Sequence, residues 1–209
     1  MTQVLGIVKE GKLIPEELWI KFVNGLENSF DALETNNERA KRELAESIVN
    51  AVKRRISPKF GVLFSGGVDS SLIAFVAKQL KCSFTCYTVG IEGSDDILWA
   101  QQAAKEYNLN FKYKILNLDE LEIVIGEVIK ILGDADIVKA SVGSVLYSAG
   151  KLAISSGDRI LFGGLGSEEI FAGYQRHEAA LANGNFEALH NECWSGLKNM
   201  QQRDLTRDF

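Results

Sequence analysis

The chain is poor in the residues and segments that identify several specialised classes of protein. It has three cysteines, and an odd number argues against a framework of disulfide bonds. No apolar run is long enough to cross a membrane, and the opening segment MTQVLGIVKEGK lacks the apolar core of a signal peptide. The net charge is −5, and a lysine–arginine cluster at residues 53–55 lies at the end of a predicted helix. We therefore expect a cytoplasmic protein with no membrane partner and no general affinity for nucleic acid.

The composition is that of an ordinary globular protein. With 46% apolar and 24% charged residues, the 209-residue chain can form one domain, or one domain with an appendage. Two short β segments (residues 4–8 and 12–14), a weak helix (15–33) and a polar stretch precede Asn36–Asn37. These features predict an N-terminal appendage over residues 1–37 and a main domain over residues 38–209.

Short apolar strands alternate with amphipathic helices through the main domain. Such alternation is typical of a parallel sheet covered by helices on both faces, which is a three-layer α/β sandwich. In this fold, ligands bind beyond the carboxyl ends of the strands, where the strand order reverses. The predicted strands are residues 60–64, 83–89, 110–116 and 159–162, and the predicted helices are residues 38–56, 70–80, 95–107, 119–132 and 144–156.

The segment Phe60–Leu72, FGVLFSGGVDSSL, predicts a buried strand, a glycine-rich turn and a helix whose first turn is rich in hydroxyls. The free N–H groups and the positive dipole end of a helix N-terminus form an anion site. A carboxylate such as Asp69 would repel a bare phosphate, so its presence makes sense if Mg²⁺ bridges it to a polyphosphate. We interpret the segment as a nucleotide pyrophosphate site; the alternative is a simple serine/glycine connector. The residues that would face the phosphates are Ser65, Gly66, Gly67, Ser70 and Ser71.

A second strand, residues 159–162, also runs into a glycine-rich turn, Gly163–Tyr174. Two such strand ends suggest two sides of one pocket. Glu168 or Glu169, at the start of the next helix, would complete the metal shell that Asp69 begins. A carboxylate at that place also stabilises a helix N-terminus through the dipole alone. By spacing, we assign the metal role to Glu168 and the capping role to Glu169.

The first motif matches neither G-x-x-x-x-G-K-[ST] nor G-x-G-x-x-G. Its pattern, S-G-G-x-D-S-S, resembles the PP-loop of ATP pyrophosphatases, which split ATP between its α- and β-phosphates. Both motifs, with the segments Asp136–Ser141 and Asp204–Asp208, resemble the synthetase domain of glutamine-dependent asparagine synthetases and their relative β-lactam synthetase. The likeness covers roughly residues 38–180 and implies the Rossmann-like fold of the adenine nucleotide alpha hydrolases.

The resemblance implies a site for ATP and Mg²⁺ and a reaction in two steps. Adenine would lie against Leu63 and Val89, and Gly164 would line the pocket near the ribose and the substrate. Asp69 and Glu168 would hold Mg²⁺. An aspartate carboxylate would attack the α-phosphorus, and ammonia would then displace AMP from the acyl-adenylate. The residues that would contact the ATP phosphates are Ser65, Gly66, Gly67, Asp69, Ser70 and Ser71.

Three departures from the family pattern bear on catalysis. Leu165 stands where the family has a glutamate thought to handle the incoming nucleophile, and leucine cannot take a proton. Thr2 stands where the family's glutaminase domain has its cysteine nucleophile, so the chain would use free ammonia or a separate glutaminase subunit. The chain also stops at Phe209, before a family lysine that neutralises the adenylation transition state, so its C-terminal end looks truncated.

Several alternatives stay open. Lys139 lies at a position that is basic in the family, and either a catalytic role near the phosphates or a solvated lysine at a helix end fits it. His177 is expected at the surface. The function is an asparagine synthetase-type ligase, an ATP-binding regulatory or partner subunit, or another PP-loop nitrogen or sulfur transferase. The last would want paired cysteines near the loop and a basic face, which this sequence lacks. A homo-oligomer is equally open.

Overall fold

The computed structural model describes residues 8–9, 12–29 and 36–199. The chain forms two compact units. One unit contains Leu44–Gly164, and the other joins Met1–Glu43 to Leu165–Phe209. The predicted boundary between residues 37 and 38 stays a prediction, although the N-terminal segment groups with a second segment that is far away in the sequence.

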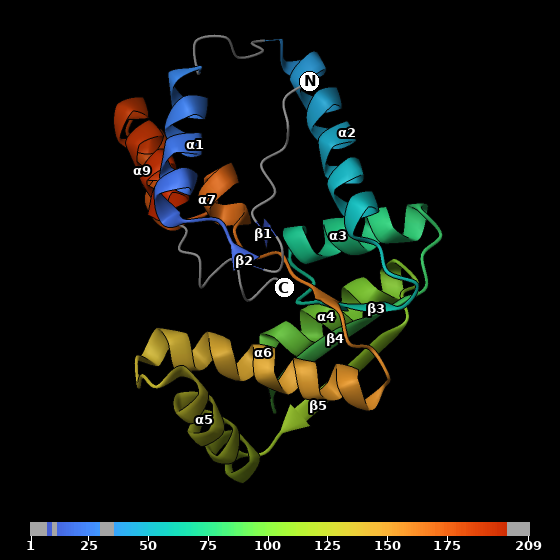
Figure 1. The fold of residues 1–209 in the computed structure, drawn as a ribbon. Helices are drawn as coiled ribbons and strands as arrows, with labels where there is room; N and C mark the ends of the chain where they lie inside the picture. The colour runs from blue at the N-terminus through green and yellow to red at the C-terminus, as the bar shows by residue number, and fades with distance from the viewer. Residues whose placement is uncertain (1–7, 10–11, 30–35, 200–209) are drawn as a thin grey trace. The chain divides into compact units, whose positions relative to one another are not determined.

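The Leu44–Gly164 unit is built on a four-stranded sheet (Figure 1). The strands are β3 (Phe60–Leu63), β4 (Phe84–Ile91), β5 (Phe111–Leu116) and β6 (Leu161–Phe162). They are ordered β5-β4-β3-β6, and every neighbouring pair is parallel. The predicted parallel α/β sheet is therefore confirmed, and the chain continues from β3 outward in both directions, so that the strand order reverses at β3.

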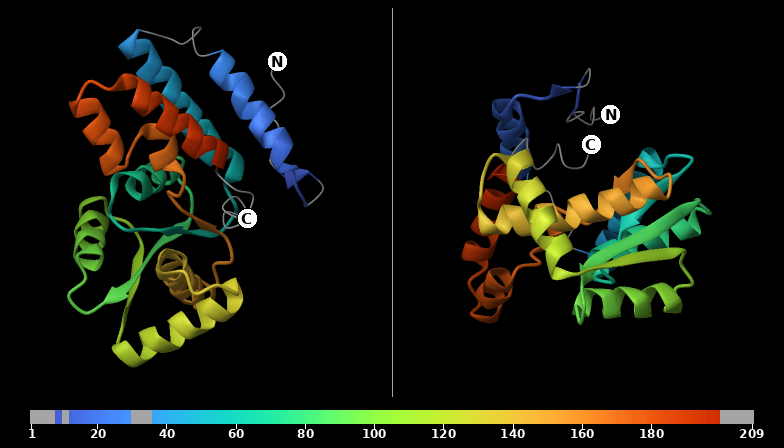
Figure 2. Two further views of the ribbon diagram at one scale, coloured as in Figure 1. Left: turned by 90° about the vertical axis from the view of Figure 1, so that its left-hand side faces the viewer. Right: turned by 90° about the horizontal axis from the view of Figure 1, so that it is seen from below.

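Helices cover both faces of this sheet (Figure 2). On one face, α3 (Val68–Gln79) and α4 (Asp95–Glu106) pack their alanines against Phe60 of β3 and against Phe64, just after that strand. On the other face, α5 (Leu118–Leu132) and α6 (Ile137–Ser155) pack against Val89 and Leu116. A strand alternates its side chains between faces, so β3 supplies Phe60 and Val62 to the first core and Leu63 to the second, and Phe64, just after the strand, joins the first core. The helix α2 (Asn37–Arg55) precedes β3.

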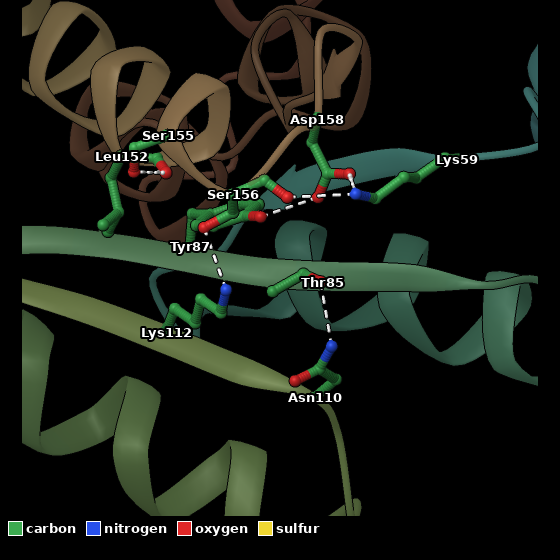
Figure 3. A network of polar contacts seen from close by, with 9 residues as sticks. All are labelled: Lys59, Thr85, Tyr87, Asn110, Lys112, Leu152, Ser155, Ser156 and Asp158. Carbon is green, nitrogen blue, oxygen red and sulfur yellow. Dashed lines mark hydrogen bonds and ion pairs between the residues drawn. The ribbon is translucent and has the colours of Figure 1, made fainter.

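A buried polar network ties the end of α6 to the sheet (Figure 3). The Tyr87 hydroxyl donates a hydrogen bond to Oδ2 of Asp158 over 2.6 Å, and both side chains are 1% exposed. Lys59, just before β3, places its Nζ 3.4 Å from Asp158 Oδ1 and donates to the Ser156 carbonyl at 3.0 Å. Lys112 of β5 donates to Ser156 Oγ at 2.9 Å. A buried carboxylate needs such partners, and here they fix the loop between α6 and β6.

The second unit contains β1 (Val8–Lys9) and β2 (Lys12–Leu13), which are antiparallel, and the helices α1 (Glu16–Asn28), α7 (Ser167–Phe171), α8 (Gln175–Ala182) and α9 (Phe186–Asn199). The indole N–H of Trp19 in α1 donates to the Leu197 carbonyl in α9 at 3.0 Å. Trp19 and Val23 are buried there, with Trp194 packed against them. The helix predicted over residues 15–33 is thus present over Glu16–Asn28, and residues 4–7 of the first predicted β segment lie outside the described residues.

The expected start of α6 was wrong. It was predicted over residues 144–156, but it begins at Ile137, where the Asp136 side chain accepts a hydrogen bond from the Lys139 N–H and caps the helix. By length and composition alone, this 19-residue helix is apolar enough to span a membrane, with a mean hydropathy of 1.2. A helix in a protein core passes the same test, and α6 packs on β4 and on α5.

Candidate active site

The turn after β3 presents backbone amides at the N-terminus of α3. Gly66 has φ of +78°, and a Cβ at that residue would lie 2.8 Å from the Trp99 carbonyl group of α4. Only glycine fits both the backbone angle and the close approach. Gly67 is the N-cap residue, and no side chain caps the helix there. The first-turn amides of α3 are therefore available to an anion.

Two hydroxyl groups give the turn its shape. Ser65 N–H donates to Ser70 Oγ at 3.3 Å, and the Gly67 N–H donates to Ser65 Oγ at 3.2 Å. The two serine oxygens lie 3.3 Å apart, and Ser70 Oγ donates to the Gly67 carbonyl at 3.2 Å. Ser71 Oγ is buried and has no hydrogen-bond partner among the described residues. Ser65 and Ser70 therefore have a role within the loop itself, whereas Ser71 has an unused hydroxyl; their phosphate contacts stay a prediction.

The two glycine-rich turns meet at Asp69. β6 pairs with β3 so that Val62 lies opposite Phe162, and both strands end at the same edge of the sheet. A Cβ at Gly164 would lie 2.7 Å from Asp69 Cβ and 3.6 Å from the Ser70 nitrogen. The half-buried Asp69 carboxyl group lies in the first turn of α3. The predicted site residues Asp69, Ser70 and Gly164 are thus brought together.

The residues predicted to face adenine are also neighbours. Leu63 packs against the cluster that contains the buried Val89, Leu116 and Ala149, all on the α6 face of the sheet. The Thr88 hydroxyl donates to the Phe64 carbonyl, which holds β4 beside the start of the turn. Leu63 and Val89 therefore form one apolar surface at the end of the strands, and their contact with a base stays a prediction.

The acidic pair lies in the short helix α7, which belongs to the other unit. Ser167 Oγ donates to Glu168 Oε2 at 3.3 Å, while the Tyr174 hydroxyl donates to Glu169 Oε1 at 2.6 Å. That bond to Glu169, together with burial, raises the pKa of Tyr174 to about 12. Both glutamates lie in the first turn of α7, and no side chain caps that helix with a hydrogen bond, so the capping role of Glu169 stays a prediction. Since Asp69 and Glu168 lie in different units, their joint hold on Mg²⁺ stays a prediction.

The described residues contain no group of three or more His, Cys, Asp or Glu side chains that would form a preformed metal centre. Mg²⁺ commonly keeps several waters and is held by one or two carboxylates together with substrate phosphates. The oxygen donors of Asp69 and of the neighbouring turn fit that kind of binding. They do not fit a zinc or copper centre, which uses histidine or thiolate ligands.

Lys139 has a local partner. It forms an ion pair with Asp134, its backbone N–H donates to Asp136 Oδ1 at 2.9 Å, and its side chain is 34% exposed. Both of its contacts are to the turn before α6. This arrangement is that of a lysine at a helix end, and a catalytic role for Lys139 stays a prediction.

The expectation that His177 lies at the surface was wrong. The side chain is 2% exposed, and its Nδ1 accepts the Tyr174 N–H at 3.3 Å at the start of α8. The two rings lie 5.3 Å apart. The sequence analysis also missed the contact of Gly66 with the Trp99 backbone, because a backbone contact between separate elements leaves no sequence signal. The Ser65–Ser70 pair had a signal, since these two hydroxyls flank the glycine turn at a spacing of five residues.

Comparison with known proteins places the fold and the two motifs in a family. A sequence model of the family described as Asparagine synthase matches residues 43–208. The chain belongs to the asparagine synthase family. It is 36% identical over 177 residues to a protein named putative asparagine synthetase [glutamine-hydrolyzing] 1 of Methanocaldococcus jannaschii, covering 84% of this chain and 32% of that protein. It is 32% identical over 180 residues to asparagine synthetase [glutamine-hydrolyzing] 2 of Lotus japonicus, covering 78% of this chain and 30% of that protein.

The chain spans about a third of the length of these curated relatives. Among solved structures, it is similar to an NH3-dependent NAD synthetase from Campylobacter jejuni, with a TM-score of 0.47 and 17% identity over 84% of this chain and 97% of that chain. The match to the family model confirms, at the level of the family, the resemblance deduced from the two motifs.

Proposed function

We propose that this asparagine synthase family chain binds ATP with Mg²⁺ and adenylates a carboxylate, with aspartate as the expected acceptor. The observation that carries the proposal is the contact of the Gly164 backbone with Asp69. It brings two strand–glycine turns to one edge of a parallel sheet, beside the uncapped N-terminus of α3. That edge is where α/β sheets of this kind bind their ligands.

In this proposal the first-turn amides of α3 and the Ser71 hydroxyl bind the β- and γ-phosphates. Ser71 Oγ is buried and has no other partner among the described residues, and a phosphate oxygen would satisfy it. Asp69, and Glu168 from the other unit, would hold Mg²⁺, which neutralises the departing pyrophosphate. Leu63 and Val89 give the base an apolar wall.

The reaction needs no covalent bond to the protein. An oxygen of the carboxylate attacks the α-phosphorus, the bond between that phosphorus and the α–β bridging oxygen breaks, and pyrophosphate leaves with both electrons of that bond. Ammonia then attacks the acyl carbon, AMP departs, and the new amide loses a proton to solvent or to a base. The chain contributes chiefly by orienting the phosphates and by placing amide dipoles against the pyrophosphate.

For the second step, the attack of ammonia, the family position of the proton acceptor is occupied by leucine. Leu165 is 47% exposed and carries no group that accepts a proton. Free ammonia or ammonia from a separate glutaminase subunit is the proposed nitrogen source, and the proposed compartment is the cytoplasm.

The leucine at position 165 favours a second candidate function. Because Leu165 lacks a proton acceptor, the chain would also suit an ATP-binding regulatory or partner subunit that has lost catalysis. The two functions share the ATP site and differ in whether an acyl-adenylate forms.

Exchange of labelled pyrophosphate into ATP separates these candidates. Adenylation is reversible, so a ligase supports exchange that depends on its carboxylate substrate, and we expect aspartate to stimulate it above a panel of other carboxylates. Glutamate and succinate are matched controls for chain length and for the amino group. ATP binding without exchange on any carboxylate favours the regulatory subunit, and absence of ATP binding removes both.

A further inference from the structure

The Leu44–Gly164 unit leaves large apolar side chains exposed on the side of its sheet that α3 and α4 cover. These two helices lie side by side, because they are joined at both ends. The Trp99 carbonyl group of α4 lies against Gly66, just before α3. Lys78, near the end of α3, donates to the Asn108 carbonyl, just after α4, at 3.2 Å. The large apolar side chains that the middle of this helix pair exposes, by 39–62%, are Leu72, Phe75, Leu98 and Trp99.

The strand β5, at the end of the sheet order, extends this surface. Phe111 packs into the core beneath α3 and α4, and the side chains of a strand alternate between its faces, so Tyr113 and Ile115 point to the same side. Both are exposed, and the Tyr113 ring stacks on Phe111 with 5.7 Å between centroids. Lys112 and Lys114 point the other way and form hydrogen bonds there. An apolar surface thus runs from α3 across α4 to β5, and we call it the α3–α4–β5 face.

The α3–α4–β5 face is large for a surface that meets only solvent. Monomeric proteins rarely expose a contiguous apolar patch of more than a few hundred Å². A whole aromatic side chain offers about 150–250 Å², so the six side chains together expose on the order of 600 Å². A standard interface buries about 800 Å² from each partner. The face therefore approaches the area that one partner supplies to a stable dimer.

The two ends of this face carry opposite charge. Asp95 and Asp96, in the first turn of α4, lie at one end, and residues 97–104 that follow are uncharged. A second copy that is turned end to end sets an acidic end against a basic end twice, whereas a copy in the same direction meets like charges. The other end carries three exposed lysines and one exposed glutamate, which are Lys78, Lys81, Lys105 and Glu106.

We propose that a second copy of this chain docks on the α3–α4–β5 face, so that the protein forms a two-fold dimer with its two α4 helices antiparallel. In a two-fold dimer the same patch serves both copies, and a face with opposite charges at its two ends is complementary to itself in that arrangement. Phe75 and Trp99 are the aromatic anchors between the charged ends. Because the Trp99 carbonyl group lies against Gly66, the dimer would hold the helix on which the phosphate turn rests.

Analytical ultracentrifugation of the whole chain, without nucleotide, tests the dimer. We expect a reversible dimer between about 1 μM and about 1 mM protein. Phe75→Glu places a charge in the apolar part of the interface and should weaken dimerisation at least tenfold. Ile123→Glu is the matched control and should leave it unchanged, because Ile123 is 66% exposed on α5, which covers the other side of the sheet. Both variants should keep the circular dichroism of the parent chain.

An exchange of charges tests how the two copies are oriented. Asp95→Lys with Asp96→Lys makes both ends of the face basic, and Lys81→Glu with Lys105→Glu makes both ends acidic. Each double variant alone should dimerise at least tenfold more weakly than the parent chain. An equimolar mixture of the two should form the dimer again, because both contacts then join opposite charges. Recovery on mixing cannot arise from damage to either fold.

Three results would overturn the proposal. The first is a chain that stays monomeric up to about 1 mM, whether or not a different protein binds the face. The second is a dimer that Ile123→Glu weakens as much as Phe75→Glu does. The third is a pair of charge variants that do not associate when they are mixed. These measurements need neither ATP nor a carboxylate, so their outcome is independent of the proposed adenylation.

Discussion

The backbone of Gly164 lies directly against the side chain of Asp69: a Cβ at residue 164 would lie 2.7 Å from Asp69 Cβ. Real Cβ atoms essentially never approach so closely, so the loop after β6 and the first turn of α3 fit together only with glycine there. This contact joins the two motifs that the sequence analysis singled out.

Replacing Gly164 tests whether this fit matters for binding. Gly164→Ala should displace Asp69 and lower the affinity for ATP with Mg²⁺ at least tenfold, with a loss of stability of about 1–3 kcal/mol. Gly163→Ala is the matched control, because a Cβ there meets only Leu63 Cδ1 at 3.6 Å. Isothermal titration calorimetry with chemical denaturation measures both quantities. Equal ATP affinities in the two variants would remove the link between the motifs and binding.

The Asp69 carboxylate should make ATP binding depend on Mg²⁺. In Asp69→Asn the cation loses its protein ligand and the repulsion of bare phosphate disappears, so ATP affinity should fall at least tenfold in Mg²⁺ and stay the same or rise in EDTA. Asp119→Asn, in the first turn of α5, controls for the loss of one acidic residue at a helix N-terminus. A variant Asp69→Asn that keeps the full Mg²⁺ dependence contradicts the cation bridge.

Substitutions of the two glutamates of α7 should have different effects, one on Mg²⁺ affinity and the other on stability. Glu168→Gln should weaken the apparent affinity for Mg²⁺ and change stability little, because its described partner is the neighbouring Ser167. Glu169→Gln should leave Mg²⁺ affinity unchanged and cost about 1.5 kcal/mol, because it removes the charged acceptor of Tyr174. Mg²⁺ titrations at fixed ATP, together with urea unfolding, give both numbers. The reverse pattern would transfer the metal role to Glu169.

Variants of Lys139 and of its partner Asp134 should show whether the lysine has a role beyond their ion pair. If the ion pair with Asp134 is all that it contributes, Lys139→Met and Asp134→Asn each cost at most about 1 kcal/mol and leave ATP binding unchanged. If the lysine acts on the phosphates, Lys139→Met alone loses pyrophosphate exchange. Because the side chain is paired and partly exposed, we expect the first outcome, and a selective loss of exchange would refute it.

The Tyr87–Asp158 bond should make stability depend on pH at the alkaline end. Burial and the Asp158 contact raise the pKa of Tyr87. A raised pKa in the folded state contributes stability that is complete below the unfolded value of about 10 and is lost as pH rises through the folded value. The free energy of unfolding should therefore fall above pH 10, and less so in Tyr87→Phe, which should itself cost about 1–2 kcal/mol at pH 8. Parallel pH profiles for the two proteins would contradict this account.

The sheet could be predicted from the sequence because each strand is an apolar run that ends in a turn. β3 and α3 were placed to within two residues, since the glycine pair marks the junction. α6 was predicted to begin seven residues too late. Gly143 and the β-branched pair Ile137–Val138 lower helix propensity, whereas in the structure Gly143 packs against Val128 of α5, which offsets that cost.

The packing of the second unit could not be deduced from the sequence, because it depends on contacts between segments that are distant in the chain. The bond between Trp19 and Leu197 spans 178 residues, and it helps to join the N-terminal and C-terminal segments into one unit. Periodicity reports only which face of an element is buried and not what covers it. The burial of His177 escaped prediction for the same reason: its neighbours are set by the tight turn between α7 and α8.

The most direct test of the central claim is the response of backbone amides to nucleotide. Titration of ¹⁵N-labelled protein with ATP and Mg²⁺ should shift the amide resonances of residues 65–71 first and most strongly, because these residues form the turn after β3 and the first turn of α3. A further shift is expected at Gly164, whose backbone lies against Asp69. The Gly126 amide, within α5, should not move. Saturating ATP that leaves the amides of residues 65–71 unchanged, or that shifts only residues elsewhere in the chain, would contradict the account.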